Sequence, residues 1–110
     1  MYSNYTITLV IPCLNEEQGL TQLLKTIPDF IDEVIVVDNN STDKTAEIAR
    51  MAGAKVLFES KRGYGKSYKS GVEAATSDFV VTLDGDGSYL AADIEKLVKI
   101  SLEEQKDFAP

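Results

Sequence analysis

The sequence predicts an α/β domain, a three-layer sandwich with a mostly parallel sheet, on two observations. Short apolar segments rich in β-branched residues alternate along the 110 residues with segments that repeat apolar residues at helical spacing. The segment from Val34 to Val37 is apolar without alternation, which is typical of a strand covered on both faces. Strands that alternate with helices pair in parallel, with right-handed crossovers and helices on the faces of the sheet.

The first strand and the first helix come early in the chain. A β-branched, apolar run predicts a strand over residues 5–11, which Pro12 ends. Asn15 is expected to cap the following helix, with glutamates in its first turn, where carboxylates suit the positive helix end. That helix closes at Pro28. Its apolar residues recur at i, i+3, i+4 and i+7, and they are Leu20, Leu23, Leu24 and Ile27.

The second strand is predicted over residues 34–37, and the polar loop 38–43 leads from it into a second helix. Gly53 fits the position just after that helix, because glycine adopts the left-handed conformation needed there. A short third strand is predicted over residues 56–58. Residues 62–65 contain two glycines and are expected to form a flexible loop.

A third helix, a fourth strand over residues 79–83 and a fourth helix complete the alternation. The apolar positions that define these two helices are Tyr68, Val72 and Ala75 in the third, and Ile94, Leu97 and Val98 in the fourth. The pattern βαβαβαβα therefore predicts one Rossmann-like domain over residues 1–110.

Composition limits the possible functions. Hydrophobic residues make up 44% of the chain, enough for a packed core, and the net charge of −7 argues against binding nucleic acid or anionic lipid through charge alone. The chain has no histidine, which excludes a Ser-His-Asp triad and histidine metal sites. Cys13, the single cysteine, is expected to be a small buried residue. No apolar stretch has the ~18 residues of a membrane span, and no leader is evident, so a cytoplasmic protein is predicted.

Polar residues follow every predicted strand, and parallel strands end at one edge of the sheet, where open α/β folds bind ligands. Amides and carboxylates can hydrogen-bond a base and ribose, and the doublet Asp84 and Asp86 can bind Mg²⁺ or Mn²⁺, which prefer oxygen ligands. The metal would then bridge a diphosphate. The edge residues are Pro12, Asn15, Glu16, Asp38, Asn40, Arg62, Gly63, Gly65, Lys66, Asp84 and Asp86.

Each of these groups also has a simpler interpretation. Aspartate and glycine dominate turns, Asn15 and Glu16 suit a helix start, and Arg62 and Lys66 can be solvated surface charges. Two other phosphate-binding motifs are excluded. A P-loop requires a glycine where this chain has Ser60, and the loop after the first strand lacks the glycine cluster of a dinucleotide site.

Three motifs together carry a family resemblance. Residues 11–17 (IPCLNEE), 36–45 (VVDNNSTDKT) and 84–87 (DGDG) resemble the inverting family-2 glycosyltransferases, closest to the polyprenyl-phosphate sugar transferases of the dolichol-phosphate mannosyltransferase type. The resemblance extends from about residue 6 to residue 98. It implies a GT-A fold and a nucleotide-diphosphate sugar as the donor. It also implies an acceptor such as a polyprenyl phosphate, used at the inner face of a membrane.

The resemblance also implies roles for individual residues. The nucleotide would be lined by Pro12, Asn15 and Glu16 and its base or ribose contacted by Asp38; the donor site would be bordered by Arg62, Gly63 and Lys66, and the metal held by Asp84, which also lies near the ribose, and by Asp86. One position departs from the mannosyltransferase type. A glutamine often follows two residues after the second aspartate there, and this chain has Ser88.

The same family places its catalytic base, an aspartate, in a second half that would follow Pro110. We therefore expect the chain to be truncated at its C-terminal side, to hold the donor-binding half, and to transfer sugar poorly alone. A sheet cut there would expose an edge and apolar surface, which predicts a homo-oligomer. A non-catalytic nucleotide-binding module is the alternative function. A receiver domain is disfavoured because Glu59, not aspartate, follows the third strand, and a nucleotidyltransferase because no glycine-rich basic loop follows the first.

Overall fold

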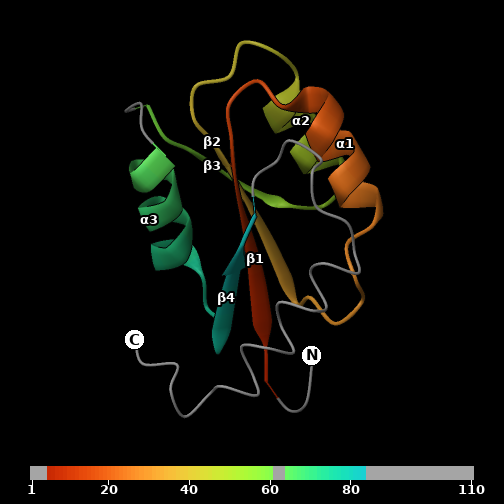
Figure 1. Ribbon diagram of the computed structural model, residues 1–110, viewed down its shortest axis with the longest axis vertical. Helices are drawn as coiled ribbons and strands as arrows, with labels where there is room; N and C mark the ends of the chain where they lie inside the picture. Colours follow the sequence, from red (N-terminus) through yellow and green to blue (C-terminus); the bar gives the residue numbers. More distant parts are fainter. Residues whose placement is uncertain (1–4, 61–63, 84–110) are drawn as a thin grey trace.

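The structure is a computed structural model that describes residues 5–60 and 64–83 (Figure 1). The predicted fourth helix lies outside the described residues. The described elements are β1 (Ile7–Cys13), α1 (Glu17–Lys25), β2 (Glu33–Asp38), α2 (Thr45–Met51), β3 (Lys55–Phe58), α3 (Tyr64–Ala74) and β4 (Phe79–Thr82).

The strands form a four-stranded sheet in the order β3-β2-β1-β4, and every pair is parallel. The predicted α/β class and parallel sheet are confirmed. The register pairs Cys13 with Asp38 and Asp38 with Phe58, so β1, β2 and β3 end level with one another. Their loops consequently leave the sheet at one carboxyl edge, at the top of Figure 1.

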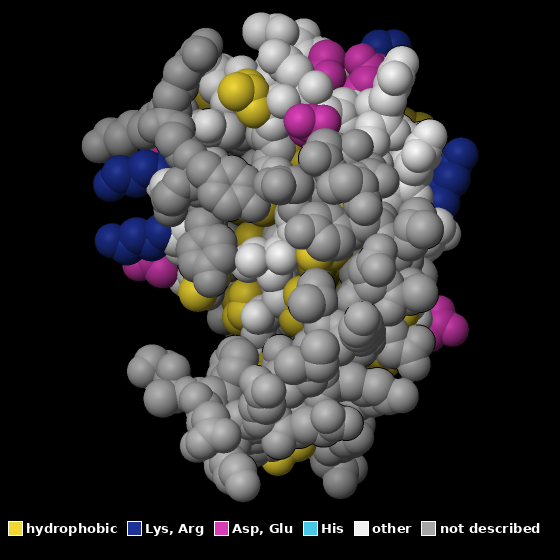
Figure 2. Space-filling model, in the orientation of Figure 1, with side chains coloured by type: hydrophobic (Ala, Val, Ile, Leu, Met, Phe, Trp, Pro, Cys, Tyr) yellow, Lys and Arg dark blue, Asp and Glu magenta, His cyan; other side chains and the backbone are white. Residues whose placement is uncertain are grey.

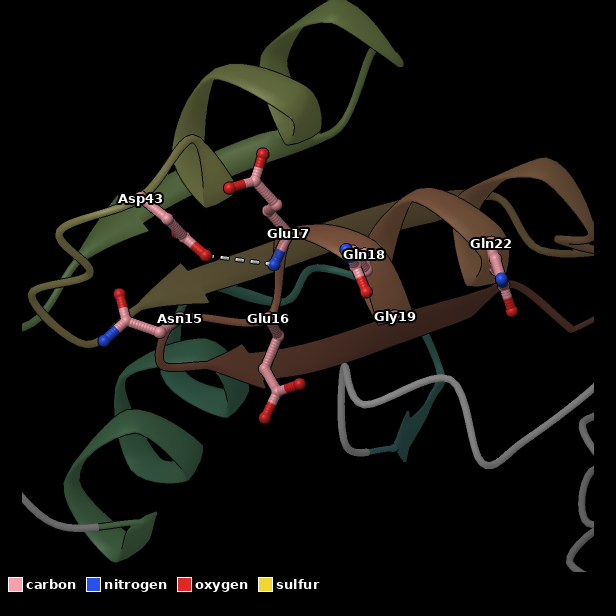
Figure 3. A pocket seen from close by; sticks show the side chains of 7 residues that line it. All are labelled: Asn15, Glu16, Glu17, Gln18, Gly19, Gln22 and Asp43. Atoms are coloured by element: carbon pink, nitrogen blue, oxygen red, sulfur yellow. Dashed lines mark hydrogen bonds between the residues drawn. The ribbon is translucent and has the colours of Figure 1, made fainter.

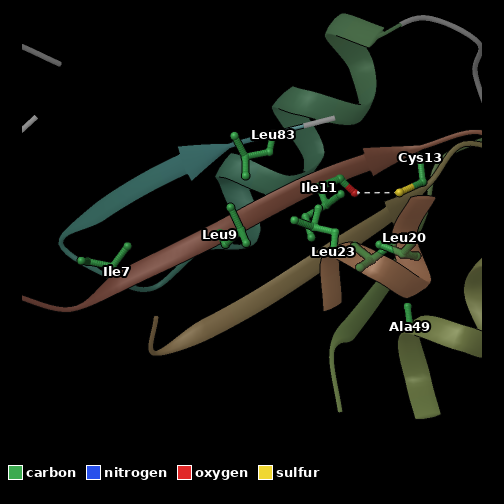
Figure 4. Close-up of a cluster of buried hydrophobic side chains, with 9 residues drawn as sticks. Ile7, Leu9, Ile11, Cys13, Leu20, Leu23, Ala49 and Leu83 are labelled. Atoms are coloured by element: carbon green, nitrogen blue, oxygen red, sulfur yellow. Dashed lines mark hydrogen bonds between the residues drawn. The ribbon is translucent and has the colours of Figure 1, made fainter. Parts of the chain in front are cut away.

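Helices α1 and α2 pack on one face of the sheet and bury the larger core (Figure 4). Apolar residues alternate along β1, so that Ile7, Leu9 and Ile11 point to this face, where Leu20 and Leu23 of α1 cover them. Burying a leucine side chain of this kind contributes about 1.5–3 kcal/mol. Cys13 is 3% exposed within this core, and its thiol contacts the carbonyl of Ile11 at 3.6 Å. The expectation of a small buried cysteine is confirmed.

Helix α3 packs on the opposite face, against Val10, Ile35 and Val37. It approaches very closely at Gly71, where a Cβ atom would lie 2.3 Å from Val10 Cγ1 and 3.0 Å from Val37 Cγ2. Only glycine fits there without a shift of the helix. The predicted three-layer sandwich is thus present, with a thinner core on the α3 side.

Several element boundaries differ from the sequence prediction: α1 ends at Lys25 rather than at Pro28, and β1 begins at Ile7 rather than at residue 5. Strand β1 continues through Pro12 to Cys13. The backbone of Val10 faces β4, where its carbonyl accepts from Leu83 N at 3.1 Å. Pro12 lies two residues on and faces the same side, beyond the described pairing of β1 with β4, so its missing N–H is not needed. Helix α3 begins at Tyr64, so Tyr64 and Gly65 belong to the helix rather than to the loop predicted over 62–65.

Gly53 follows α2 with φ +86°, as predicted for a left-handed residue after a helix. Among the described residues, no helix combines the length and the apolar character needed to cross a bilayer.

Candidate functional site

The carboxyl edge brings the β1–α1 loop and the β2–α2 loop side by side, because β1 and β2 are neighbours and end in register. Acidic side chains gather near this end of the molecule in the view of Figure 2. Hydrogen bonds join the two loops at several points, so this edge is held as one unit.

Asn15 joins the two loops and does not cap α1. The N-cap position belongs to Glu16, and no side chain caps the helix there. Asn15 has φ +54°, a conformation that asparagine tolerates better than most residues. Its Oδ1 accepts from Thr42 N at 2.8 Å, and its own N–H donates to Ser41 Oγ at 2.9 Å. The predicted capping role is wrong, because these bonds to the other loop hold the residue outside the helix.

The backbone N–H groups at the start of α1 donate to side chains of the segment that leads from β2 into α2. Glu16 N donates to Thr45 Oγ1 at 3.1 Å, and Glu17 N donates to Asp43 Oδ2 at 3.2 Å. A helix start normally needs a nearby side chain for this purpose. Here the partners come from a segment 26 to 29 residues away.

Asp43 is a site residue that the sequence prediction missed. Its Oδ1 accepts hydrogen bonds from the backbone N–H of Thr45, at 3.0 Å, and from the Thr45 hydroxyl. Burial raises the pKa of Asp43, but the hydrogen bonds from Thr45 and Glu17 outweigh it, so the pKa lies below its ordinary value. The carboxylate is therefore charged at neutral pH. The available signal was an aspartate two residues before the helix start.

Asp38 is 6% exposed at the end of β2. Its Oδ1 accepts from Ser41 N at 3.0 Å, and Ser41 in turn bonds Asn15, so residues 15 and 38 lie at the same edge, linked through Ser41. The simpler interpretation of Asp38 as a turn former is confirmed. Its contact with a base or ribose stays a prediction.

A hollow of about 450 Å³ opens beside the start of α1 (Figure 3). Carboxylate and amide side chains dominate its lining, with Asn15 and Asp43 at one end and Gln22 a turn along the helix. Such groups accept hydrogen bonds from the N–H groups of a base and the hydroxyls of a sugar. The lining residues are Asn15, Glu16, Glu17, Gln18, Gly19, Gln22 and Asp43.

The predicted site residues separate into four groups. Asn15 and Glu16 line the hollow, whereas Pro12 and Asp38 are buried near the ends of β1 and β2 and do not line it. Lys66 is exposed on α3, on the other face of the sheet. Arg62, Gly63, Asp84 and Asp86 lie outside the described residues.

The predicted metal ligands follow β4. Leu83, the residue before Asp84, donates its N–H to the carbonyl of Val10 in β1 at 3.1 Å, toward the carboxyl edge. Within residues 5–60 and 64–83, no cluster of three or more acidic, cysteine or histidine side chains could hold a metal ion.

The parallel sheet, with helices on both faces and polar loops at its carboxyl edge, is the architecture of the open α/β domains that bind ligands at that edge. The family model for glycosyl transferase family 2 matches residues 8–109, and the chain belongs to that family. An uncharacterized glycosyltransferase of Mycobacterium tuberculosis is 49% identical over 84% of this chain and 42% of its own length. Protein RfbJ of Shigella flexneri is 30% identical over 97% of this chain and 84% of its own length. The chain thus spans less than half of the mycobacterial relative.

Solved structures of the same fold include glucosyl-3-phosphoglycerate synthase from Mycobacterium tuberculosis. It is 32% identical, with a TM-score of 0.68, over 76% of this chain and 34% of the synthase chain. That enzyme was crystallised with Mn²⁺, uridine diphosphate and glucosyl-3-phosphoglycerate, and also with Mg²⁺ and uridine diphosphate. The resemblance to family-2 glycosyltransferases and the GT-A type of fold are confirmed.

Proposed function

We propose that this chain holds the donor-binding part of a glycosyltransferase that transfers a sugar from a nucleotide-diphosphate sugar with the help of a divalent cation. The observation that carries this proposal is a pair of loops, β1–α1 and β2–α2, beside a polar hollow at the carboxyl edge. Hydrogen bonds join the two loops to each other, and we call them the laced loops. Backbone N–H groups of the two loops donate hydrogen bonds to the side chains of Asn15, Ser41 and Asp43, so the loops are preorganised. Preorganised polar groups lose little entropy when a ligand binds.

The donor is expected to place its base and ribose near Asn15, Glu16 and Asp38, with Pro12 forming the apolar support beneath. The Lys66 side chain, together with Arg62 and Gly63, would meet the diphosphate. Uridine diphosphate is the first nucleotide to test, since the synthase of similar fold was crystallised with it.

A Mg²⁺ or Mn²⁺ ion would be held by Asp84 and Asp86. The carboxylate oxygens suit these metals, and the described chain reaches Leu83 near the edge where the laced loops lie. When bound, such an ion stabilises negative charge on the departing diphosphate as a Lewis acid. The chain's own part is to bind the nucleotide and to orient it.

The acceptor and the base that deprotonates it belong to the finer part of the proposal. We propose a lipid phosphate acceptor of the polyprenyl type, reached at the inner face of a membrane, and a catalytic base supplied by sequence beyond residue 110. The mycobacterial synthase was crystallised with phosphoglyceric acid, so a soluble phosphorylated acceptor is the competing outcome. A radiolabelled sugar recovered in an organic extract would favour the lipid, and one recovered in water the alternative.

We also propose that the chain self-associates through an outer strand of its sheet, which in the described residues is β3 or β4. Light scattering over a concentration series gives the mass directly. A mass of one chain at the highest concentration would contradict this expectation.

Calorimetric titration tests the donor proposal. Uridine diphosphate and its glucose ester should bind with Mn²⁺ present and at least tenfold more weakly without it. Asp86→Ala should remove the metal dependence, because it removes a carboxylate ligand. Asp29→Ala is the matched control, since Asp29 is an exposed aspartate in the α1–β2 connection, away from the carboxyl edge. Binding indifferent to both the metal and Asp86→Ala would overturn the proposal.

A further inference from the structure

Glu59, the first residue after β3, joins three segments of the carboxyl edge. Its carbonyl accepts from Asn39 Nδ2 at 2.8 Å, and its N–H donates to the carbonyl of Asp38 at 2.9 Å. Its side-chain Oε1 accepts from Ser70 Oγ of α3, also at 2.8 Å. One residue therefore connects the end of β2, the end of β3 and the helix on the far face of the sheet.

The contact at Ser70 fixes a particular face of α3. Ser70 comes four residues after Lys66, so the two side chains lie on the same face of the helix, one turn apart. Gly71 faces the sheet and sets how closely the helix approaches Val10 and Val37. Because Gly71 has no side chain, it sets depth but gives little resistance to rotation. The bond from Ser70 to Glu59 supplies that resistance.

The other end of the connection is Asp38, the residue expected near the base or ribose. Asn39 is 7% exposed, and its backbone N–H also donates to the carbonyl of Cys13 at 2.8 Å, so this end is anchored in the centre of the sheet. The spacing between Asp38 and the Lys66 face of α3 therefore depends on Glu59.

We propose that Glu59 is a positioning residue, which holds the Lys66 face of α3 at a fixed distance and rotation from the Asp38 loop. This inference rests on the proposed function, because a nucleotide diphosphate would have to reach both ends. Glu59 touches neither end of the donor itself. It acts on the helix through Ser70 and on the β2 loop through Asp38 and Asn39. Hydrogen bonds to a carboxylate are stronger than those between neutral groups, which suits this role.

The role separates nucleotides by the number of their phosphates. The base and ribose would be held by the laced loops, whose hydrogen bonds do not involve Ser70. The terminal phosphate would depend on Lys66. Loss of the Ser70 bond should consequently weaken binding of uridine diphosphate more than binding of uridine monophosphate.

The test compares the dissociation constants of these two nucleotides, with Mn²⁺, by calorimetry. Ser70→Ala and Glu59→Ala should each raise the constant for uridine diphosphate about fivefold, the effect of one lost hydrogen bond, and leave that for uridine monophosphate within twofold. Glu59→Gln keeps an Oε1 acceptor, so its dissociation constant for uridine diphosphate should stay close to that of the unsubstituted chain. Ser77→Ala removes a hydroxyl at the opposite edge, bonded to Thr8, and should alter neither constant.

Hydrogen exchange gives a second measurement if Glu59→Ala folds poorly. Ser70→Ala should speed exchange in α3 while β1 and β2 stay protected. Three results would overturn the positioning role: equally weakened binding of both nucleotides, unchanged binding of both, or a Glu59→Gln variant that binds uridine diphosphate as weakly as Glu59→Ala does. If the unsubstituted chain binds no uridine diphosphate, the proposed function fails and this role fails with it. If it binds but the variants match it, only the positioning role fails.

Discussion

The two edges of the sheet use hydrogen bonds differently. At the amino edge they join strand ends to one another: the Thr8 hydroxyl, fully buried, bonds Glu33 Oε1 at 2.8 Å and Ser77 Oγ at 2.7 Å. At the carboxyl edge they join loops. There Asn15 and Asp43 hold the neighbouring backbone while remaining in the lining of an open hollow.

This difference teaches that polar residues at strand ends can serve stability alone or stability together with binding. At the amino edge the Thr8 residue is fully buried, and the exposed bonds between Thr6 and Asp78 join strand ends only, so we expect that edge to contribute to folding alone. Bonds at the carboxyl edge fix backbone geometry and leave charged and amide atoms facing solvent. Substitutions at the two edges should therefore separate effects on unfolding from effects on nucleotide binding.

The largest expected effect is the loss of stability on substitution of Gly71, because α3 packs tightly on the sheet at this residue. Gly71→Ala would drive a methyl group into Val10, 2.3 Å away, and should lower the free energy of unfolding by about 3 kcal/mol. Urea denaturation measures this. Gly53→Ala, just after α2, is the matched control: its Cβ would meet nothing within 4 Å, and only its φ of +86° should cost about 1 kcal/mol. Equal losses in the two variants would contradict the close approach of α3.

Asp43→Ala should show the combined role of the carboxyl edge. It removes the acceptor for Thr45 and for Glu17 N at the starts of two helices, so the free energy of unfolding should fall by about 2 kcal/mol. Nucleotide affinity should fall as well, by tenfold or more. Calorimetry at a temperature where the variant is fully folded separates the two effects. An unchanged affinity would mean that the laced loops do not form the binding site.

Thr8→Val is the counterpart at the amino edge. It keeps the shape of the side chain and removes the hydroxyl from Glu33 and Ser77, which should cost about 1 kcal/mol of stability. Nucleotide affinity should stay the same, since the change is at the opposite end of β1. A clear loss of affinity would break the proposed division between the edges.

The smallest expected effect is in the pH dependence of stability. Hydrogen bonds hold the pKa of Asp43 below its ordinary value of 3.8, so its folded form binds protons less readily than its unfolded form. Its contribution is fully present above the unfolded pKa and is lost as the pH falls through the lower, folded pKa. The difference in free energy of unfolding between the unsubstituted chain and Asp43→Asn should therefore shrink below about pH 4. Urea melts at several pH values measure it; a difference that grows on acidification would contradict the assignment.

Local patterns predicted the elements well, and tertiary contacts decided the rest. The continuous apolar run in β2 and the glycine after α2 carry their own signals, and both predictions are confirmed. Asn15 was wrongly predicted to cap α1 because its true partner, Thr42, is 27 residues away. Gly65 suggested a loop, yet it lies in α3, where packing of the helix on the sheet outweighs a weak local propensity.

The candidate site was predicted only in part, because tertiary contacts also decide which of its residues become neighbours. Asn15, Glu16 and Asp38 follow strand ends, a position that parallel topology alone sends to one edge. The strand order, with β1 in the centre of the sheet, is not encoded in any local pattern. Asp43 and Glu59 were missed because their roles depend on which loops become neighbours. The predicted roles of Arg62, Gly63, Asp84 and Asp86 stay predictions.

Amide hydrogen exchange with and without uridine diphosphate and Mn²⁺ tests the central claim most directly, because it reports on both edges in one experiment. We predict slower exchange in the loops at residues 14–17 and 39–45, with residues 6–8, 31–33 and 76–78 at the amino edge unchanged. Protection confined to the amino edge, or absent from both edges at saturating nucleotide, would contradict the assignment of the carboxyl edge as the donor site.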